Sequence, residues 1–334
     1  MTPNPTPRTA AVDAASAHRI PGRARYRLAA LGALVVTGAL VLSGCGDQTK
    51  SKDKADDGGK SGSSSSAPLA DKLPQEIRDK GVIRVGSDIA YAPVEFKDKD
   101  GNTAGIDPDL ADAMGSLLGV KFDFQRGTFE TLLTGLRSKR YDIAMSAMTD
   151  SKDRQNGIDS ETGKKVGEGV DFVDYFNAGV SIYTLKGKTQ GINGWGDLCG
   201  KTIVLQRATI SDDLAKAEAK KCPAGKKLTI EAFDTDEQAQ TRLRSGGADA
   251  GSSDYPVAAY AVQTSGGGKD FQIVGKQVEA APYGIAVAKS NTQLRDALKA
   301  AMDQLIKDGT YAKIVQRWGV ENGAVKQAGI NLGK

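Results

Sequence analysis

Apolar residues in the central part of the chain follow two different periods. Val82 to Gly86 is a short apolar run of the kind that forms a buried strand. Between Leu110 and Leu118, apolar residues instead recur every three or four positions, as in a helix with one buried face. Asp107 is suited to cap this helix with Pro108 in its first turn, and Gly119 to end it. The pattern predicts a strand followed by an amphipathic helix.

The same alternation continues along the chain. Phe122 and Phe124 alternate with polar residues as in a strand, residues 129–138 have helical spacing, and residues 143–145 form an apolar strand. Strands and helices in this order predict a mainly parallel sheet with helices on its faces.

A second region repeats this order. Its predicted strands are 202–205, 228–232 and a short strand led by 248–250, and its predicted helices are 211–220, 236–244 and 256–263.

The last part of the chain returns to the first region. Residues 285–288 form a predicted strand, Thr292 caps a long amphipathic helix that Gly309 ends, and a final helix leads to Trp318. We therefore expect two α/β lobes, with the chain re-entering the first lobe at its end. The polar, glycine-rich stretch Asn156–Gly169 is interpreted as a surface insertion.

The N-terminal segment has the pattern of an export signal. A basic stretch from Arg19 to Arg27 precedes the apolar run Leu28–Leu42, whose 15 residues suit a signal peptide and are short for a membrane span. The run leads into Ser43-Gly44-Cys45, which resembles a lipobox, where cleavage precedes a cysteine that is then lipidated. We predict a signal peptide over 1–44, a lipidated Cys45 and a flexible tether over 45–70. An ordinary signal peptide or an uncleaved anchor is the alternative.

The charge distribution separates this leader from the rest of the chain. The formal net charge of the chain is +4, and the five arginines and one aspartate of residues 1–44 account for all of it. The single histidine, His18, also lies in the leader. The remaining chain is neutral, which disfavours nucleic-acid binding. Without a histidine it can form neither a Ser-His-Asp nor a Cys-His catalytic site, nor a His-ligated metal site, and we expect no metal and no cofactor.

Two further cysteines, Cys199 and Cys222, remain after the lipobox cysteine. Outside the cytoplasm such a pair predicts a disulfide. A metal or redox pair is the alternative, but no CxxC spacing or histidine supports it.

The order of these elements resembles the extracytoplasmic solute-binding proteins of ABC importers, in the group that binds polar amino acids. Gly105–Leu110 is similar to the family signature, apart from Pro108, and the resemblance extends over 75–320 to Asp308–Tyr311 and Trp318. It implies a two-lobed, type II periplasmic-binding-protein-like α/β fold. The ligand would lie in the interlobe cleft, with hinge strands near 178–180 and 281–283. The implied lobes are 71–179 plus 282–334, and 180–281.

A free amino acid is a zwitterion, so its site needs a cation for the carboxylate and an anion for the ammonium. The planar fork of an arginine binds both carboxylate oxygens at once. By resemblance, the carboxylate partners are Arg154, Thr149, Thr209 and the backbone amide of Ile210 at a helix N-terminus, while Ala147 offers a carbonyl to the ammonium.

The same resemblance implies the remaining contacts. Asp254 is the expected ammonium partner, with a helix cap before Pro256 as the alternative. Tyr91 and Phe129 would enclose the aliphatic part of the ligand. Asp88, Gln206 and Ser253 map near its side chain, a set with one carboxylate and no cation, which favours a basic amino acid or glutamine.

These features predict a binding protein and not an enzyme. The two lobes would close around a free amino acid, and the membrane subunits of an ABC permease would read the closed form. We expect a monomer that is lipid-anchored to the outer face of the cytoplasmic membrane. The alternatives are an enzyme on the same fold, such as a dehydratase of cyclic amino-acid precursors, and an extracellular amino-acid sensor.

Overall fold

The computed structural model describes residues 67–334, which lie within one compact unit of the chain. The predicted signal peptide, the lipidated Cys45 and most of the tether fall outside the described residues. Residues 67–70 already belong to the fold, because the amide of Leu69 donates to the carbonyl of Leu117 and its side chain packs on the main core. The folded part thus begins slightly before the expected boundary at residue 71.

A nine-stranded sheet organises the described chain, in the strand order β4-β1-β5-β10-β6-β9-β7-β8, with β11 paired to β6. The strands β1, β4 and β5 are parallel to one another, as are β7, β8 and β9. β2 and β3 form a separate small hairpin. The bounds are β1 Val82–Ser87, β2 Phe96–Lys97, β3 Thr103–Ala104, β4 Lys121–Arg126, β5 Ile143–Ala144, β6 Val170–Leu185, β7 Thr202–Gln206, β8 Thr229–Phe233, β9 Ala250–Asp254, β10 Phe271–Ala288 and β11 Ala324–Ile330.

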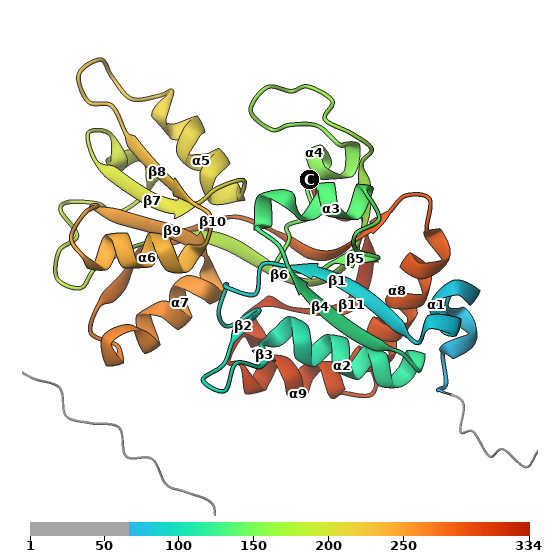
Figure 1. The fold of residues 1–334 in the computed structure, drawn as a ribbon. Coiled ribbons are helices and arrows are strands. Elements are labelled where there is room, and N and C mark those ends of the chain that lie inside the picture. Colours follow the sequence, from blue (N-terminus) through green and yellow to red (C-terminus); the bar gives the residue numbers. More distant parts are fainter. Residues whose placement is uncertain (1–66) are drawn as a thin grey trace, which may run out of the picture. The chain divides into compact units, whose positions relative to one another are not determined.

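Helices cover both parallel groups. Figure 1 shows α2, α8 and α9 beside β1, β4 and β11, and α5, α6 and α7 around β7, β8 and β9. The bounds are α1 Gln75–Lys80, α2 Ile106–Leu118, α3 Leu132–Arg137, α4 Lys152–Asn156, α5 Ile210–Ala219, α6 Asp236–Arg244, α7 Tyr255–Thr264, α8 Thr292–Lys307 and α9 Thr310–Arg317.

The two groups are joined by β6 and β10, which are antiparallel to each other and contain 16 and 18 residues. The beginning of β6 and the end of β10 pair beside β5 and β11, whereas the other ends lie beside β9 (Figure 1). Ala178 pairs with Ala281 and Val180 with Val278 where the two strands pass from one lobe to the other. A Cβ at Gly179 would lie 2.7 Å from the Val278 carbonyl oxygen, so glycine permits the close approach there. This is the predicted two-lobed α/β architecture.

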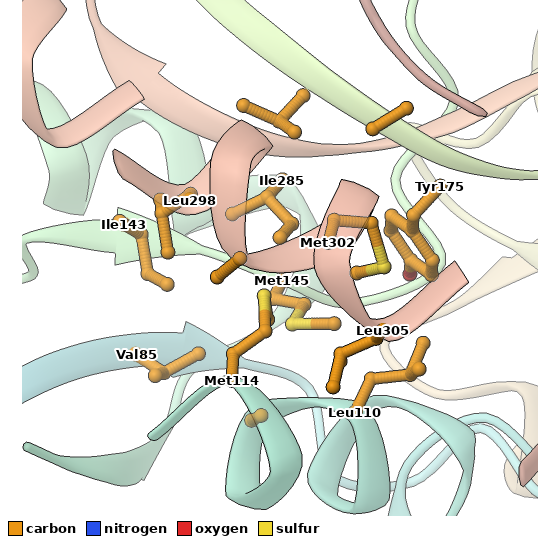
Figure 2. Packing of buried hydrophobic residues seen from close by; sticks show 14 of the residues in the cluster. Val85, Leu110, Met114, Ile143, Met145, Tyr175, Ile285, Leu298, Met302 and Leu305 are labelled. Atoms are coloured by element: carbon orange, nitrogen blue, oxygen red, sulfur yellow. The ribbon is translucent and has the colours of Figure 1, made fainter. Parts of the chain in front are cut away.

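The first lobe is built on the apolar face of α2. Its buried residues pack against α8 and α9, and Figure 2 shows Met114, Met145 and Met302 close together between α2 and α8. Methionine suits this contact because its unbranched side chain fills irregular gaps. This core fixes the carboxyl ends of β1 and β5, after which the cavity residues follow.

The second lobe has its own apolar cores. One contains Leu198, Ile203 and Ala215 between β7 and α5, and the other lies under α6 and α7. The predicted disulfide is confirmed: Cys199 and Cys222 are bonded, with their Cα atoms 5.4 Å apart. It joins the segment before β7 to the turn after α5, and it therefore fixes one end of that helix.

Some expected details differ in the structure. Asp107 does not cap α2, because its carboxylate is buried and accepts hydrogen bonds from Tyr175 and from the Ala147 amide. The cap of α8 is Asn291, whose side chain accepts from the Leu294 amide, and Thr292 is the first helical residue. The strand β11 was not predicted, and of β6 and β10 only the hinge segments near 178–180 and 281–283 and the strand 285–288 were.

Among residues 67–334, no helix is both long and apolar enough to span a membrane.

The disulfide gives a first prediction. Replacing both Cys199 and Cys222 by serine should lower the free energy of unfolding by about 3 kcal/mol, because the closed loop limits the entropy of the unfolded chain. Urea denaturation measures this loss. Wild-type protein treated with reductant is the control and should match the double variant. An unchanged midpoint in both samples would contradict the prediction.

Candidate functional site

One cavity brings together residues from both lobes. Its empty volume is about 290 Å³, including the part that opens to solvent. Ten of the eleven predicted ligand contacts line it, and Glu95 lines it as well; Ser253 is buried and is not part of the lining. The lining consists of Asp88, Tyr91, Glu95, Phe129, Ala147, Thr149, Arg154, Gln206, Thr209, Ile210 and Asp254.

The lining residues follow the carboxyl ends of parallel strands. Asp88 comes directly after β1, and Gln206 is the last residue of β7. Parallel strands end at one edge of a sheet, and loops after these ends are where α/β folds place their ligands. Two such edges, one in each lobe, therefore face each other across the cavity.

Arg154 lies in the short helix α4, which Ser151 caps by accepting from the Arg154 amide. Its Nη1 donates to the Thr149 carbonyl at 2.8 Å, and its Nη2 donates to the Ala208 carbonyl of the other lobe at 3.1 Å. The guanidinium also lies 5.3 Å from the centre of the Phe129 ring. Burial lowers the pKa of Arg154, but a guanidinium stays charged over the physiological range. The cavity thus contains one fixed cation.

Thr209 caps α5, the helix that faces Arg154 from the second lobe. Its side chain accepts from the Asp212 amide and donates to the Gln206 carbonyl at 2.7 Å. The preceding Ala208 has φ 59°, in the left-handed region that favours glycine. This turn directs the start of the ten-residue helix toward the cavity, where free amides favour an anion.

Asp254 is the last residue of β9. Its Oδ2 accepts a hydrogen bond from the Tyr283 hydroxyl at 2.8 Å, while its amide donates to the Tyr91 hydroxyl at 3.0 Å. Its side chain makes no capping hydrogen bond to α7, which removes support for the helix-cap alternative. Burial raises the pKa of Asp254 to about 6, against the lowering effect of Tyr283 and Arg154.

Asp88 faces Gln206 across the lobes. The Gln206 amide donates to Asp88 Oδ2 at 2.8 Å, and burial raises the pKa of Asp88 to about 6. Ser146 fixes the Asp88 backbone by accepting from its amide at 3.0 Å.

Glu95 was missed by the sequence analysis. It is fully buried, its Oε1 accepts from the Ser146 hydroxyl at 2.6 Å, and burial beside Asp107 raises its pKa well above the usual range. The available signal was a glutamate in the apolar stretch that follows Tyr91. Burial therefore favours the neutral form of Glu95.

The two lobes are in contact around the cavity. The Asn156–Gly169 insertion was predicted to lie on the surface, and it also contacts α5 of the second lobe. The Ser160 hydroxyl donates to Asp213 at 2.8 Å, and Lys216 pairs with Glu161 at 3.0 Å. Together with the Asp88–Gln206 and Arg154–Ala208 contacts, these bonds join the two lobes.

Residues 83–321 match the profile of the bacterial extracellular solute-binding proteins, family 3. The chain belongs to this family. A similar curated relative is the arginine-binding protein ArgT of Corynebacterium glutamicum, 33% identical over 78% of this chain and 81% of that protein. The predicted family is confirmed.

Solved structures of the same kind share the fold. An ancestral arginine-binding protein bound to arginine is 34% identical, with a TM-score of 0.64 over 72% of this chain and 98% of that one. An ancestral arginine-binding protein bound to glutamine is also 34% identical, with a TM-score of 0.62 over 72% and 99%. The predicted two-lobed fold class is confirmed, and this solute-binding protein of family 3 is a binding protein, not an enzyme.

Buried carboxyls give the second prediction. Burial raises the pKa of Asp107, Asp174 and Asp236 to about 7, above the value of about 3.9 in an unfolded chain. The folded protein therefore holds more protons between about pH 4 and pH 7, and the free energy of unfolding falls as pH rises through this window. We expect the ligand-free protein to be at least about 1.4 kcal/mol more stable at pH 5 than at pH 7.5, the equivalent of one carboxyl shifted by one pH unit.

Urea denaturation at the two pH values measures this difference. Asp236 is buried in α6 outside the cavity lining, so Asp236→Asn should reduce the pH dependence in proportion to one carboxyl. Equal stability of the wild type at both pH values would contradict the expectation.

Proposed function

We propose that this protein captures a free basic amino acid of the arginine type and delivers it to an ABC permease. The ligand carboxylate binds Arg154, Thr149, Thr209 and the Ile210 amide. The ammonium binds Asp254 and the Ala147 carbonyl. Tyr91 and Phe129 enclose the aliphatic part, and the cationic end of the side chain binds Asp88 beside Gln206 and the buried Ser253.

The charge of the cavity is the observation that carries this proposal. At neutral pH Asp88 and Asp254, whose pKa values lie near 6, and Arg154 are ionised, and the raised pKa of Glu95 favours its neutral form. Two anions and one cation leave one uncompensated negative charge. An amino acid with a cationic side chain carries one net positive charge and neutralises it, whereas an acidic one would place like charges together in a buried site.

The position of Asp88 favours arginine over glutamine. A guanidinium presents several donors in a planar fork that fits a carboxylate, so it gains a charge-assisted pair that a neutral amide cannot make. The names of the relatives support the class of ligand, arginine or glutamine, and the charge of Asp88 carries the choice between them. ArgT is named for arginine, and of the two structures of ancestral arginine-binding proteins one holds arginine and the other glutamine.

Closure of the lobes is the proposed signal to the permease. The contacts of Arg154 and Gln206 join groups of both lobes, so a ligand that binds both sides favours the closed arrangement. The proposed lobes are 71–179 plus 282–334, and 180–281, with β6 and β10 as hinge strands. We further propose that residues 1–44 are removed as a signal peptide, that Cys45 anchors a monomer to the outer face of the membrane, and that the segment from Cys45 to residue 66 forms a tether.

Calorimetric titration with the twenty amino acids tests the ligand class. Arginine, ornithine or lysine should bind most tightly, and agmatine, which lacks the carboxylate, should bind far more weakly. If no amino acid binds at pH 7.5, the proposed function is wrong.

Removal of the carboxylate partner gives the third prediction. Arg154→Ala should weaken arginine binding at least tenfold, because hydrogen bonds to a charged group contribute about 1.5–3 kcal/mol each. The melting temperature should stay close to the wild-type value. Arg78→Ala, in the exposed part of α1, is the matched control. Wild-type affinity in Arg154→Ala would remove this residue from the proposed site.

The fourth prediction separates side-chain specificity from recognition of the zwitterion. Asp88→Asn should weaken arginine binding about tenfold or more, and it should leave glutamine binding unchanged or stronger, because only arginine pairs with the lost charge. Titration of both ligands measures the ratio, with Asp123→Asn on exposed β4 as the control. An equal loss for both ligands would show that Asp88 does not read the side chain.

A further inference from the structure

Tyr283 is a buried titratable group outside the cavity lining and outside the proposed set of ligand contacts. It lies in β10, two residues after Ala281, where β6 and β10 pass between the lobes. Only 1% of its surface is exposed. Its ring stacks on Phe176 with ring centres 5.6 Å apart, and Tyr175 lies at 6.4 Å. This packing holds the Tyr283 side chain in one conformation, so the position of its hydroxyl is fixed.

The backbone around Tyr283 is tied to the carboxylate side of the cavity. Tyr283 forms an isolated bridge with Thr149, the carbonyl of Pro282 accepts from the Asp150 amide at 2.8 Å, and the Gly284 amide donates to the Met148 carbonyl at 2.9 Å. These bonds belong to the first lobe.

The hydroxyl of Tyr283 reaches the other lobe. It donates to Oδ2 of Asp254, at the end of β9, at 2.8 Å. One residue therefore connects the loop that carries Thr149 with the carboxylate that faces the ammonium end of the cavity.

We propose that Tyr283 is the positioning residue for Asp254: its hydroxyl fixes the carboxylate in one rotamer and keeps it ionised when the lobes close. The inference rests on the proposed function, since it takes Asp254 as the ammonium partner. Because the bond spans the lobes, the ammonium partner is fully oriented only in the closed arrangement.

The surroundings of Asp254 explain why such a donor matters. The groups that face it are Tyr91 and Glu95 after β1, Arg154 in α4, Asp236 in α6 and Tyr283 itself. Burial opposes the ionised form, while Arg154 and the Tyr283 hydrogen bond favour it. Without the hydroxyl, the lone pair of a buried carboxylate oxygen loses its donor, and the carboxyl keeps its proton to a higher pH.

The pH profile of arginine binding tests this role. The wild-type affinity should fall as pH decreases through about 6, the pKa of both Asp254 and Asp88, because protonation removes the charge that binds the ammonium and the charge that binds the side chain. In Tyr283→Phe the part of this transition that belongs to Asp254 should rise by roughly one pH unit, since loss of a charge-assisted hydrogen bond is equivalent to a shift of that size, while the part that belongs to Asp88 should stay near 6. Affinity at pH 6.5 should fall several-fold, and affinity at pH 8.5 should be within about threefold of wild type.

Tyr311→Phe is the matched control. The Tyr311 hydroxyl is also buried and hydrogen-bonded, to the Tyr175 carbonyl at 2.8 Å, but it lies outside the cavity lining. Its variant should keep the wild-type midpoint. Asp254→Asn should bind weakly at every pH and should keep only the pH dependence that comes from Asp88, whose pKa is also about 6.

A second substitution covers the case in which Tyr283→Phe does not fold. Replacing Tyr283 by 3-fluorotyrosine keeps the ring and makes the hydroxyl a stronger donor, so the binding midpoint should move to lower pH. An unchanged midpoint in a folded variant, or an equal loss of affinity at all pH values, overturns the positioning role. Absence of arginine binding by the wild type overturns the proposed function instead.

Discussion

The burial of ionisable groups between two lobes is the constraint on which this structure depends. Isolated charges are costly to remove from water, so each needs a partner or a changed protonation state. Arg154 finds carbonyl oxygens on both sides of the cleft, Asp88 finds an amide, and Asp254 finds a phenol. Each of these partners comes from a separate segment of the chain. The cleft is therefore electrostatically complete only when both lobes contribute.

This constraint sets stability against binding. The buried carboxyls with raised pKa values make the folded state more stable as pH falls, because they bind protons that the unfolded chain does not hold. The proposed ligand needs Asp88 and Asp254 ionised, so its affinity should decrease as pH falls. The uncompensated negative charge of the site is thus the source of both the affinity for a cation and part of the loss of stability at neutral pH. Sites that bind charged ligands commonly carry such a cost.

The two long strands give this site its mechanics. β6 and β10 pass through both lobes, and their close approach at Gly179 leaves a narrow connection between two separately packed cores. Rigid lobes on a narrow connection favour a hinge motion over local deformation. The insertion adds contacts between Ser160 and Asp213 and between Glu161 and Lys216 at the opposite side of the cleft. Exposed pairs of this kind each contribute little free energy. They therefore stabilise the closed arrangement only slightly, and the ligand supplies most of the free energy of closure.

The sequence by itself determined much of this protein. Hydrophobic periodicity predicted most helices and the short parallel strands, because each has one buried face that local spacing reveals. The cysteine count predicted the disulfide, and the order of the elements with Gly105–Leu110 identified the family, whose resemblance implied almost all of the cavity lining. Only the tertiary structure decided the rest. β6 is buried along nearly its whole length and the middle of β10 is largely exposed, so neither shows the alternation of a half-buried strand and both were hidden as continuous strands. Glu95 and Tyr283 became visible only through partners 51 and 29 residues away, Ser146 and Asp254. The role of Asp107 changed from cap to buried acceptor because a polar side chain satisfies whichever partner the packed fold brings closest.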